Sequence, residues 1–126
     1  MNPRDIIQAI TDKGLEIHLT SEGRVKIENL NTLPEDLRSL ARSQREGISS
    51  HLRQASDSIW AELDAILDRW ERGCRWWAER PGLDDGRAYK LIGDVGSDVI
   101  RLLGDLERIS PADARLKDAR ERFDKW

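Results

Sequence analysis

Residues 57–80, DSIWAELDAILDRWERGCRWWAER, decide the fold class of this chain. Their large apolar side chains recur at alternating intervals of three and four residues, in the order Trp60, Leu63, Leu67, Trp70, Cys74 and Trp77. This spacing places them along one stripe of an α-helix, in the manner of a coiled-coil seam. The stretch therefore predicts a long amphipathic helix that packs against another helix through this stripe.

A second seam follows the break at Pro81-Gly82, and its members are Ala88, Ile92, Val95, Val99, Leu102, Leu106 and Ile109. Two seams joined by a short break predict an antiparallel helical hairpin. The glycines of this second seam weaken its helix and leave open a local break around Gly93–Ser97. Ser110-Pro111 then predicts the start of a last helix, which carries Leu116, Ala119, Phe123 and Trp126.

The pattern upstream of these helices changes period several times. Asn2 and Pro3 suit the start of a short helix, and Gly14 suits its end. Apolar residues then alternate with polar ones in residues 15–19 and again in residues 24–28. Two short alternating runs joined by a turn that contains glycine predict a β-hairpin.

Two further helix starts follow the hairpin, because Thr32 with Glu35 and Ser43 with Glu46 have capping-box spacing. They predict two short helices with a bend near Arg42-Ser43. The expected fold class is α+β and mostly α, with a helix–β-hairpin–helix–helix unit over residues 1–54. Residues 55–126 are expected to form a second, helical segment that contains the antiparallel helical hairpin and the C-terminal helix. Gln54-Ala55-Ser56 would form a short link, so that either the second part packs on the first or a long helix continues outward from it.

Charge and composition limit the classes of function. The 21 basic and 24 acidic residues leave a net charge of −3, so no single-sign field favours nucleic acid, unless it binds through a complex. No apolar stretch is long enough to span a membrane, and no signal peptide is expected. The single Cys74 suits a reducing cytoplasm. Opposite charges four residues apart, such as Asp68–Arg72 and Glu71–Arg75, are interpreted as helix support.

No arrangement of residues typical of catalysis or metal binding is present. His18 and His51 have no neighbours at metal-ligand spacing. Cys74 lies on the first seam, where a small buried thiol is expected rather than a nucleophile. We therefore expect a protein that is not an enzyme and that carries no metal or cofactor.

The second strand of the hairpin, with Arg24, Val25, Lys26 and Ile27, is the first candidate binding site. A strand at the edge of a two-stranded sheet offers unpaired N–H and C=O groups to an incoming peptide. The alternative is that the charges here only protect an exposed edge from aggregation.

Trp76 is the second candidate, because it lies off the seam beside Arg72 and Arg75. An exposed tryptophan among arginines is typical of an interface hot spot. The alternatives are that Trp76 packs within the chain or that it stacks on single-stranded nucleic acid. The nearby carboxylates make stacking on nucleic acid the weaker interpretation.

Short motifs in residues 3–53 also carry a resemblance to a known family. They are Ile6-Ile7-x-x-Ile10, Lys13-Gly14-Leu15-x-Ile17-x-Leu19, Arg24-Val25-Lys26-Ile27, Leu33-Pro34-Glu35-Asp36-Leu37-Arg38, Gln44-Arg45-Glu46-Gly47-Ile48 and His51-Leu52. This order resembles the N-terminal docking domain of the TubC type, from the tubulysin synthetase. The resemblance implies a commonly dimeric fold whose hairpin receives the acidic C-terminal tail of an upstream synthetase protein. Arg24 and Lys26 would be its basic positions.

Residues 55–126 match no family that we can name, and they carry neither a carrier-protein serine motif nor a condensation-type double-histidine motif. The leading hypothesis is a non-catalytic docking or adaptor protein that binds a protein partner through the hairpin edge and the Trp-bearing helices. The alternative is a regulator from a phage or mobile element. It would inhibit a host defence complex, as an anti-CRISPR does, or assist a replication helicase or primase. A small core, free hairpin edges and apolar seams predict a homodimer in either case.

Overall fold

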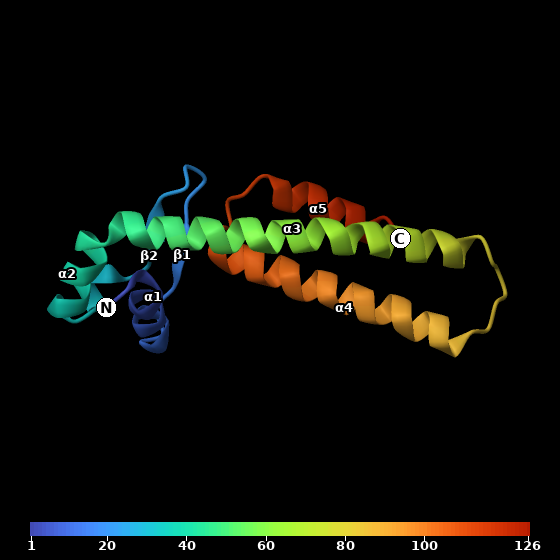
Figure 1. Ribbon diagram of the computed structural model, residues 1–126, viewed down its shortest axis with the longest axis horizontal. Helices are drawn as coiled ribbons and strands as arrows, with labels where there is room; N and C mark the ends of the chain where they lie inside the picture. Colours follow the sequence, from blue (N-terminus) through green and yellow to red (C-terminus); the bar gives the residue numbers. More distant parts are fainter. The chain divides into compact units, whose positions relative to one another are not determined.

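The computed structural model describes residues 1–126 and is mostly helical, with one small antiparallel sheet (Figure 1). In chain order its elements are α1 (Pro3–Asp12), β1 (Ile17–Leu19), β2 (Val25–Ile27), the 3-10 helix η1 (Leu30–Thr32), α2 (Glu35–Ser43), α3 (Arg45–Ala78), α4 (Gly86–Ile109) and α5 (Arg115–Asp124). This confirms the expected class, α+β and mostly α. None of the helices combines the length and the apolar character needed to cross a membrane.

The chain folds into two compact units. Unit 1 consists of Met1–Asp57 and Glu107–Asp113, and unit 2 consists of Ser58–Leu106 and Ala114–Trp126. Both α3 and α4 contribute residues to each unit. Gln54-Ala55-Ser56 lie inside α3, in agreement with the alternative that one long helix continues from the first part into the second.

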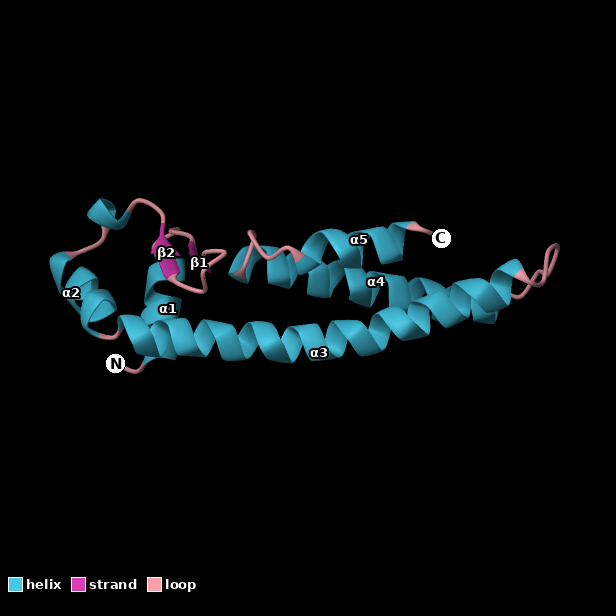
Figure 2. Cartoon of the chain, turned by 90° about the horizontal axis from the view of Figure 1, so that it is seen from above, coloured by secondary structure: helices cyan, strands magenta, loops and turns pink.

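The first elements of unit 1 form as their local sequence predicts. The side chain of Asn2 accepts a hydrogen bond from the N–H of Asp5 at 2.9 Å and caps α1, which begins at Pro3. Gly14 follows the helix with a φ of 78°, a left-handed conformation that favours glycine. Strands β1 and β2 (Figure 2) then pair antiparallel, with Ile17 opposite Ile27.

The helices after the hairpin begin differently from the expected capping boxes. Thr32 lies in η1, and Pro34 precedes α2 without a capping side chain. The expected break is confirmed, since α2 ends at Ser43 and α3 begins at Arg45, but the helix that follows is long rather than short. Apolar side chains from all these elements form the core of unit 1, namely Ile6, Ile10, Leu19, Leu33, Leu37, Ala41, Ile48 and Leu52.

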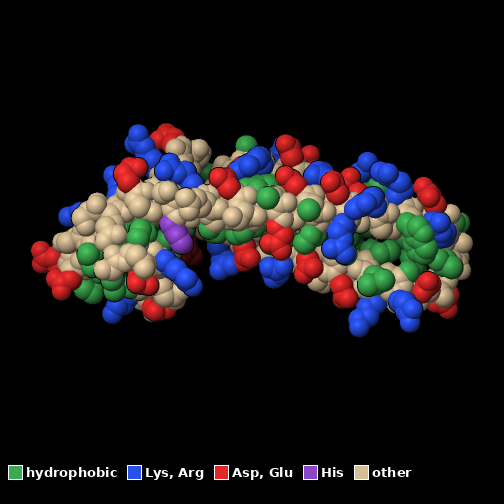
Figure 3. Space-filling model, viewed as in Figure 1, with side chains coloured by type: hydrophobic (Ala, Val, Ile, Leu, Met, Phe, Trp, Pro, Cys, Tyr) green, Lys and Arg blue, Asp and Glu red, His purple; other side chains and the backbone are tan.

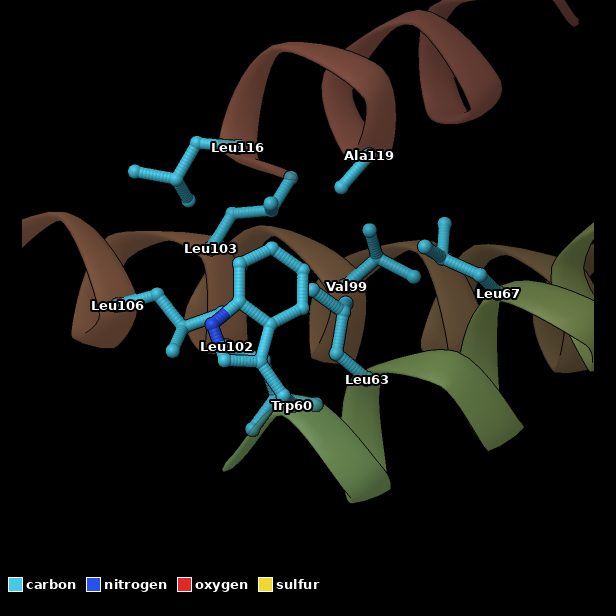
Figure 4. Close-up of a cluster of buried hydrophobic side chains, with 9 residues drawn as sticks. All are labelled: Trp60, Leu63, Leu67, Val99, Leu102, Leu103, Leu106, Leu116 and Ala119. Carbon is cyan, nitrogen blue, oxygen red and sulfur yellow. The ribbon is translucent and has the colours of Figure 1, made fainter. Parts of the chain in front are cut away.

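Unit 2 is built on the expected antiparallel helical hairpin. Side chains from α3, α4 and α5 point toward one another in its core (Figure 4), and they are Trp60, Leu63, Leu67, Val99, Leu102, Leu103, Leu106, Leu116 and Ala119. The outer members of the first seam, Trp70, Cys74 and Trp77, are only half-buried. The core of unit 2 therefore fills the part of the helical hairpin that α5 covers.

The later helices settle one question that the sequence left open and correct two expectations. Helix α4 runs unbroken from Gly86 to Ile109, without the local break that the glycines left open. Its last seam residue, Ile109, packs against the core of unit 1 instead of unit 2. The last helix starts at Arg115 rather than at Ser110-Pro111, which lie before it in the connection from α4.

In addition to the shared core, an aromatic contact and an arginine hold helix α5 on α3. The rings of Trp70 and Phe123 lie 4.8 Å apart, and the indole N–H of Trp70 donates to the carbonyl of Phe123 at 3.2 Å. Arg122 donates to Glu71 at 2.6 Å and to Asp68 at 3.1 Å. The two acidic residues that were expected to support α3 through neighbouring arginines therefore bind α5 instead.

Two glycines of α4 are expected to respond in opposite ways to alanine. A Cβ atom on Gly96 would lie 2.8 Å from Cζ3 of Trp70, whose ring is fixed by Phe123, whereas one on Gly93 would meet no atom within 4 Å. Overpacking costs roughly 1–3 kcal/mol, which outweighs the gain of up to about 1 kcal/mol in helix propensity. Urea unfolding should therefore show Gly96→Ala destabilised and Gly93→Ala stabilised by about 0.4–1 kcal/mol. Equal shifts for both variants would contradict this packing of α4 on Trp70.

Candidate functional site

Strand β2 has an open outer edge, because the sheet of unit 1 contains only β1 and β2. The carbonyl of Arg24 accepts a hydrogen bond from Thr20 at 2.7 Å, and the N–H of Glu28 also donates toward the β1 side at 3.0 Å. Bonded positions alternate along an antiparallel pair. The N–H and C=O groups of Val25 and Ile27 therefore point to the outer edge, where an extended peptide can pair with them.

A groove of about 270 Å³ lies beside β2, and we call it the hairpin groove. It is lined by Val25, Ile27, Leu30, Ala41, Arg42 and Arg45. The floor is apolar, and the two arginines supply its charge. Neither guanidinium forms an ion pair with a carboxylate of the chain. The groove thus combines apolar surface with two positive charges that are free to bind an anionic group.

Arg24 and Lys26, the basic residues expected at this site, already have acidic neighbours. Arg24 lies 3.9 Å from Glu22, and Lys26 lies 3.4 Å from Glu28. All four side chains are exposed, so each pair contributes little to stability. Their main effect is to reduce the net charge that the hairpin offers to a partner, which leaves Arg42 and Arg45 as the stronger anion-binding groups.

Trp76 on α3 is 37% exposed. The guanidinium of Arg80 stacks over its ring, 4.3 Å from the centroid, and the ring of Trp77 lies 6.3 Å away. Arg72 and Arg75 are exposed on the same helix without a carboxylate partner. Trp76 therefore does not pack in a core, and it forms part of an open surface of aromatic and basic side chains.

Hydrophobic side chains gather over the ends of α3 and α4 next to their connecting loop (Figure 3). Unit 2 also has a groove, about 340 Å³ in volume, in this part of the helical hairpin. We call it the aromatic groove, and it is lined by Trp70, Cys74, Trp77, Ala78, Tyr89, Ile92, Gly93 and Trp126. Tyr89 is 70% exposed and Trp126 is 45% exposed. Large exposed aromatic side chains of this kind are typical of interaction surfaces.

Cys74 is the thiol in this groove, and its surroundings make it a poor nucleophile. Burial raises the pKa of Cys74 above its ordinary value, which lowers the fraction of thiolate near neutral pH. We expect iodoacetamide to alkylate Cys74 more slowly in the folded chain than in the chain unfolded by urea. The alkylation rate of the folded chain should also begin to rise at a higher pH than that of the unfolded chain. Mass spectrometry over a series of pH values measures both rates. Faster alkylation of the folded chain would identify Cys74 as an activated thiol.

No group of three or more His, Cys, Asp or Glu side chains is arranged to hold a metal ion. In the hairpin groove the structure brings together an open strand edge, apolar side chains and guanidinium groups.

Sequence reasoning found only part of each site. Val25 to Ile27 do form β2, with Arg24 directly before it, and Trp76 does lie on an exposed surface with Arg72 and Arg75. Arg42 and Arg45 were missed as binding residues, because only the fold places α2 and the start of α3 beside β2. The bend predicted near Arg42-Ser43 was the one local sign that the chain changes direction between α2 and α3. Tyr89 was missed for the same reason, because it meets Trp77 only across the helical hairpin. Trp126 was assigned to the last helix, but it lies after the end of α5.

Comparison of the chain with family models, with curated proteins and with solved structures gives no match.

Proposed function

We propose that this chain is a non-catalytic docking or adaptor protein that binds an extended, acidic segment of a partner protein along the outer edge of β2. The observation that carries the proposal is the hairpin groove. There, the open strand edge lies next to apolar side chains and to two arginines that have no acidic partner.

An added strand would form hydrogen bonds with the backbone of this site and would also contact its apolar and basic side chains. Its N–H and C=O groups pair with those of Val25 and Ile27, as in other complexes formed by strand addition. Alternate side chains of the incoming strand point to the same face, so its apolar residues can cover Leu30 and the rest of the groove floor. Carboxylates between or beside them bind Arg42 and Arg45 through charge-assisted hydrogen bonds, which are the stronger kind.

The resemblance of residues 3–53 to docking domains of the TubC type supports the same function. In those domains a hairpin receives an acidic tail, which is the chemistry that Arg42 and Arg45 add to this groove. The exposed Trp76 and the arginines around it give the partner a second area to contact on the Trp-bearing helices. A folded partner with an acidic extended tail would use both areas, whereas an isolated tail would use only the hairpin groove.

Selection from a displayed library of random peptides tests this proposal and needs no purified partner protein. The bait is the intact chain, and the matched control bait is the Val25→Pro variant, which loses a backbone donor at the strand edge. We expect the intact chain to enrich peptides in which acidic residues alternate with apolar ones, and the control bait to lose them. Enrichment of basic peptides, of helical amphipathic peptides or of the same peptides by both baits would contradict strand addition at β2.

A further inference from the structure

The pair of helices in unit 2 has one face that α5 does not cover. Arg122 of α5 binds α3 at Glu71, and Gly73 lies about 160° further round the same helix, because successive residues turn by about 100°. On the side of Gly73 there is a groove of about 350 Å³, lined by Arg69, Trp70, Arg72, Gly73, Leu91, Ile92 and Val95. We call this surface the Leu91 face.

The centre of the Leu91 face is apolar and partly open to solvent. Leu91 is a large aliphatic side chain of α4, yet it is 61% exposed. Val95 lies one turn further along α4 and is half-buried, so the two side chains form a short stripe. Burying such a stripe against a second apolar surface is favourable by about 25 cal/mol for each Å² removed from water.

The basic and acidic residues at the borders of the Leu91 face lie on different helices. The α3 border carries Arg69 and Arg72, neither of which forms an ion pair within the chain. The α4 border carries Asp94, which also has no ion pair, and Asp98, whose only ion pair is with Arg101 at 3.8 Å. Over the stretch of α4 that contains Asp94 and Asp98, one border is therefore acidic and the other basic, and Arg87 and Arg101 lie beyond the two ends of this stretch.

The two borders also lie at matching levels along the helices. Gly73 faces Ile92, and Gly96 faces Trp70, which fixes how α3 and α4 are aligned. Because the helices run antiparallel, Arg72 lies level with Asp94. By the same alignment, Arg69 lies at a level between Asp94 and Asp98.

We infer that the Leu91 face binds a second copy of this chain, in a dimer whose two-fold axis runs parallel to α3 and α4. A rotation about such an axis keeps each residue at its level and places α3 of one copy over α4 of the other. Arg69 and Arg72 of each copy then face Asp94 and Asp98 of the other, on both sides of the packed Leu91 side chains. The four helices form a bundle-like interface in which the same patch serves both copies.

The balance of charge favours a second copy over a different partner. A partner with a uniformly acidic surface would meet Arg69 and Arg72 but would repel Asp94 and Asp98, and a basic one would do the reverse. An identical surface rotated by two-fold symmetry meets both borders with the opposite charge. This inference concerns unit 2 and does not depend on peptide binding at the hairpin groove.

Charge exchange between two variants tests the dimer directly. Sedimentation equilibrium of the intact chain at tens of micromolar should show a dimer. Arg69→Glu with Arg72→Glu should bring like charges together at both borders and weaken association by about tenfold or more. Asp94→Arg with Asp98→Arg should do the same. Circular dichroism checks that both variants remain folded.

An equal mixture of the two variants gives the decisive result. Every border then meets the opposite charge, so we expect a heterodimer with an affinity close to that of the unchanged chain. An unchanged chain that is monomeric at tens of micromolar would overturn the inference. So would a mixture that stays monomeric, or a dimer that neither pair of substitutions weakens, because that dimer would use another surface.

Discussion

Replacing Leu67 with alanine is expected to lower the free energy of unfolding by about 2–5 kcal/mol, and Leu102→Ala should have an effect of the same size. Leu67 is fully buried and Leu102 is 1% exposed, and both lie in the core of unit 2 (Figure 4). Each truncation removes apolar contacts and leaves a cavity that the three helices cannot fully close. Urea unfolding followed by circular dichroism measures the loss, which is large beside a typical total of about 5–15 kcal/mol.

Ile100→Ala is the matched control for these substitutions. Ile100 lies on the same helix as Leu102, but its side chain is 62% exposed. Its truncation should change the stability by no more than about 0.5 kcal/mol. If Leu67→Ala and Leu102→Ala were as mild as the control, the two seams would not face each other in the way that the structure describes.

The largest effect on binding is expected from the double variant Arg42→Glu with Arg45→Glu. Its reversed charges would repel an acidic strand in the hairpin groove, so the affinity should fall about 10- to 100-fold. A short synthetic peptide that alternates glutamate with valine serves as the probe. Fluorescence anisotropy at low and high salt measures the affinity, and the difference between the variant and the unchanged chain should shrink at high salt.

Two further variants separate the candidate surfaces. Arg24→Glu with Lys26→Glu makes the same change of charge, but these residues already lie beside Glu22 and Glu28, so we expect a smaller loss of affinity. Trp76→Ala should leave binding of the short peptide unchanged. If Trp76→Ala abolished binding and both charge reversals were silent, the Trp-bearing helices would be the binding surface and the hairpin only a scaffold.

The parts of the fold that could be predicted from the sequence are those fixed by near neighbours. Asn2 caps a helix through a residue three positions away, and Gly14 ends it through its own backbone conformation. The hairpin follows from alternation within two short runs. The two seams were found because the period of a helix repeats over many residues, so Leu67 and Leu102 could both be assigned to the core.

The predictions from sequence are wrong where contacts between residues far apart in the chain determine the local structure. The spacing of Thr32 and Glu35 suggests a capping box, yet the chain forms η1 there and the hydroxyl of Thr32 donates to the carbonyl of Asn29 instead. Arg122 binds Glu71 across 51 positions in the sequence, which no pattern of local charge pairs can reveal. Ser110 offered a good start signal, but the connection from α4 continues past it to Arg115.

The candidate site divides in the same way. An open strand edge follows from the hairpin itself, so β2 could be named from the sequence. The charge that matters most in the groove comes from Arg42 and Arg45, which reach β2 only because two helices after the hairpin fold back beside it. The sequence alone suggests Arg24 and Lys26 as the basic residues of the site, although both lie next to carboxylates in the structure.

The backbone of β2 during binding provides the most direct test of strand addition. Amide signals of the intact, isotopically labelled chain are followed by NMR while the peptide of alternating glutamate and valine is added. Strand addition predicts that the NMR signals of the Val25 and Ile27 N–H groups shift. Their exchange with solvent should slow by a factor of about ten or more. Lys26 already bonds toward β1, so its exchange should change less. A peptide that binds without slowing exchange at Val25 and Ile27, or that perturbs only Trp76 and its neighbours, would contradict docking at the hairpin edge.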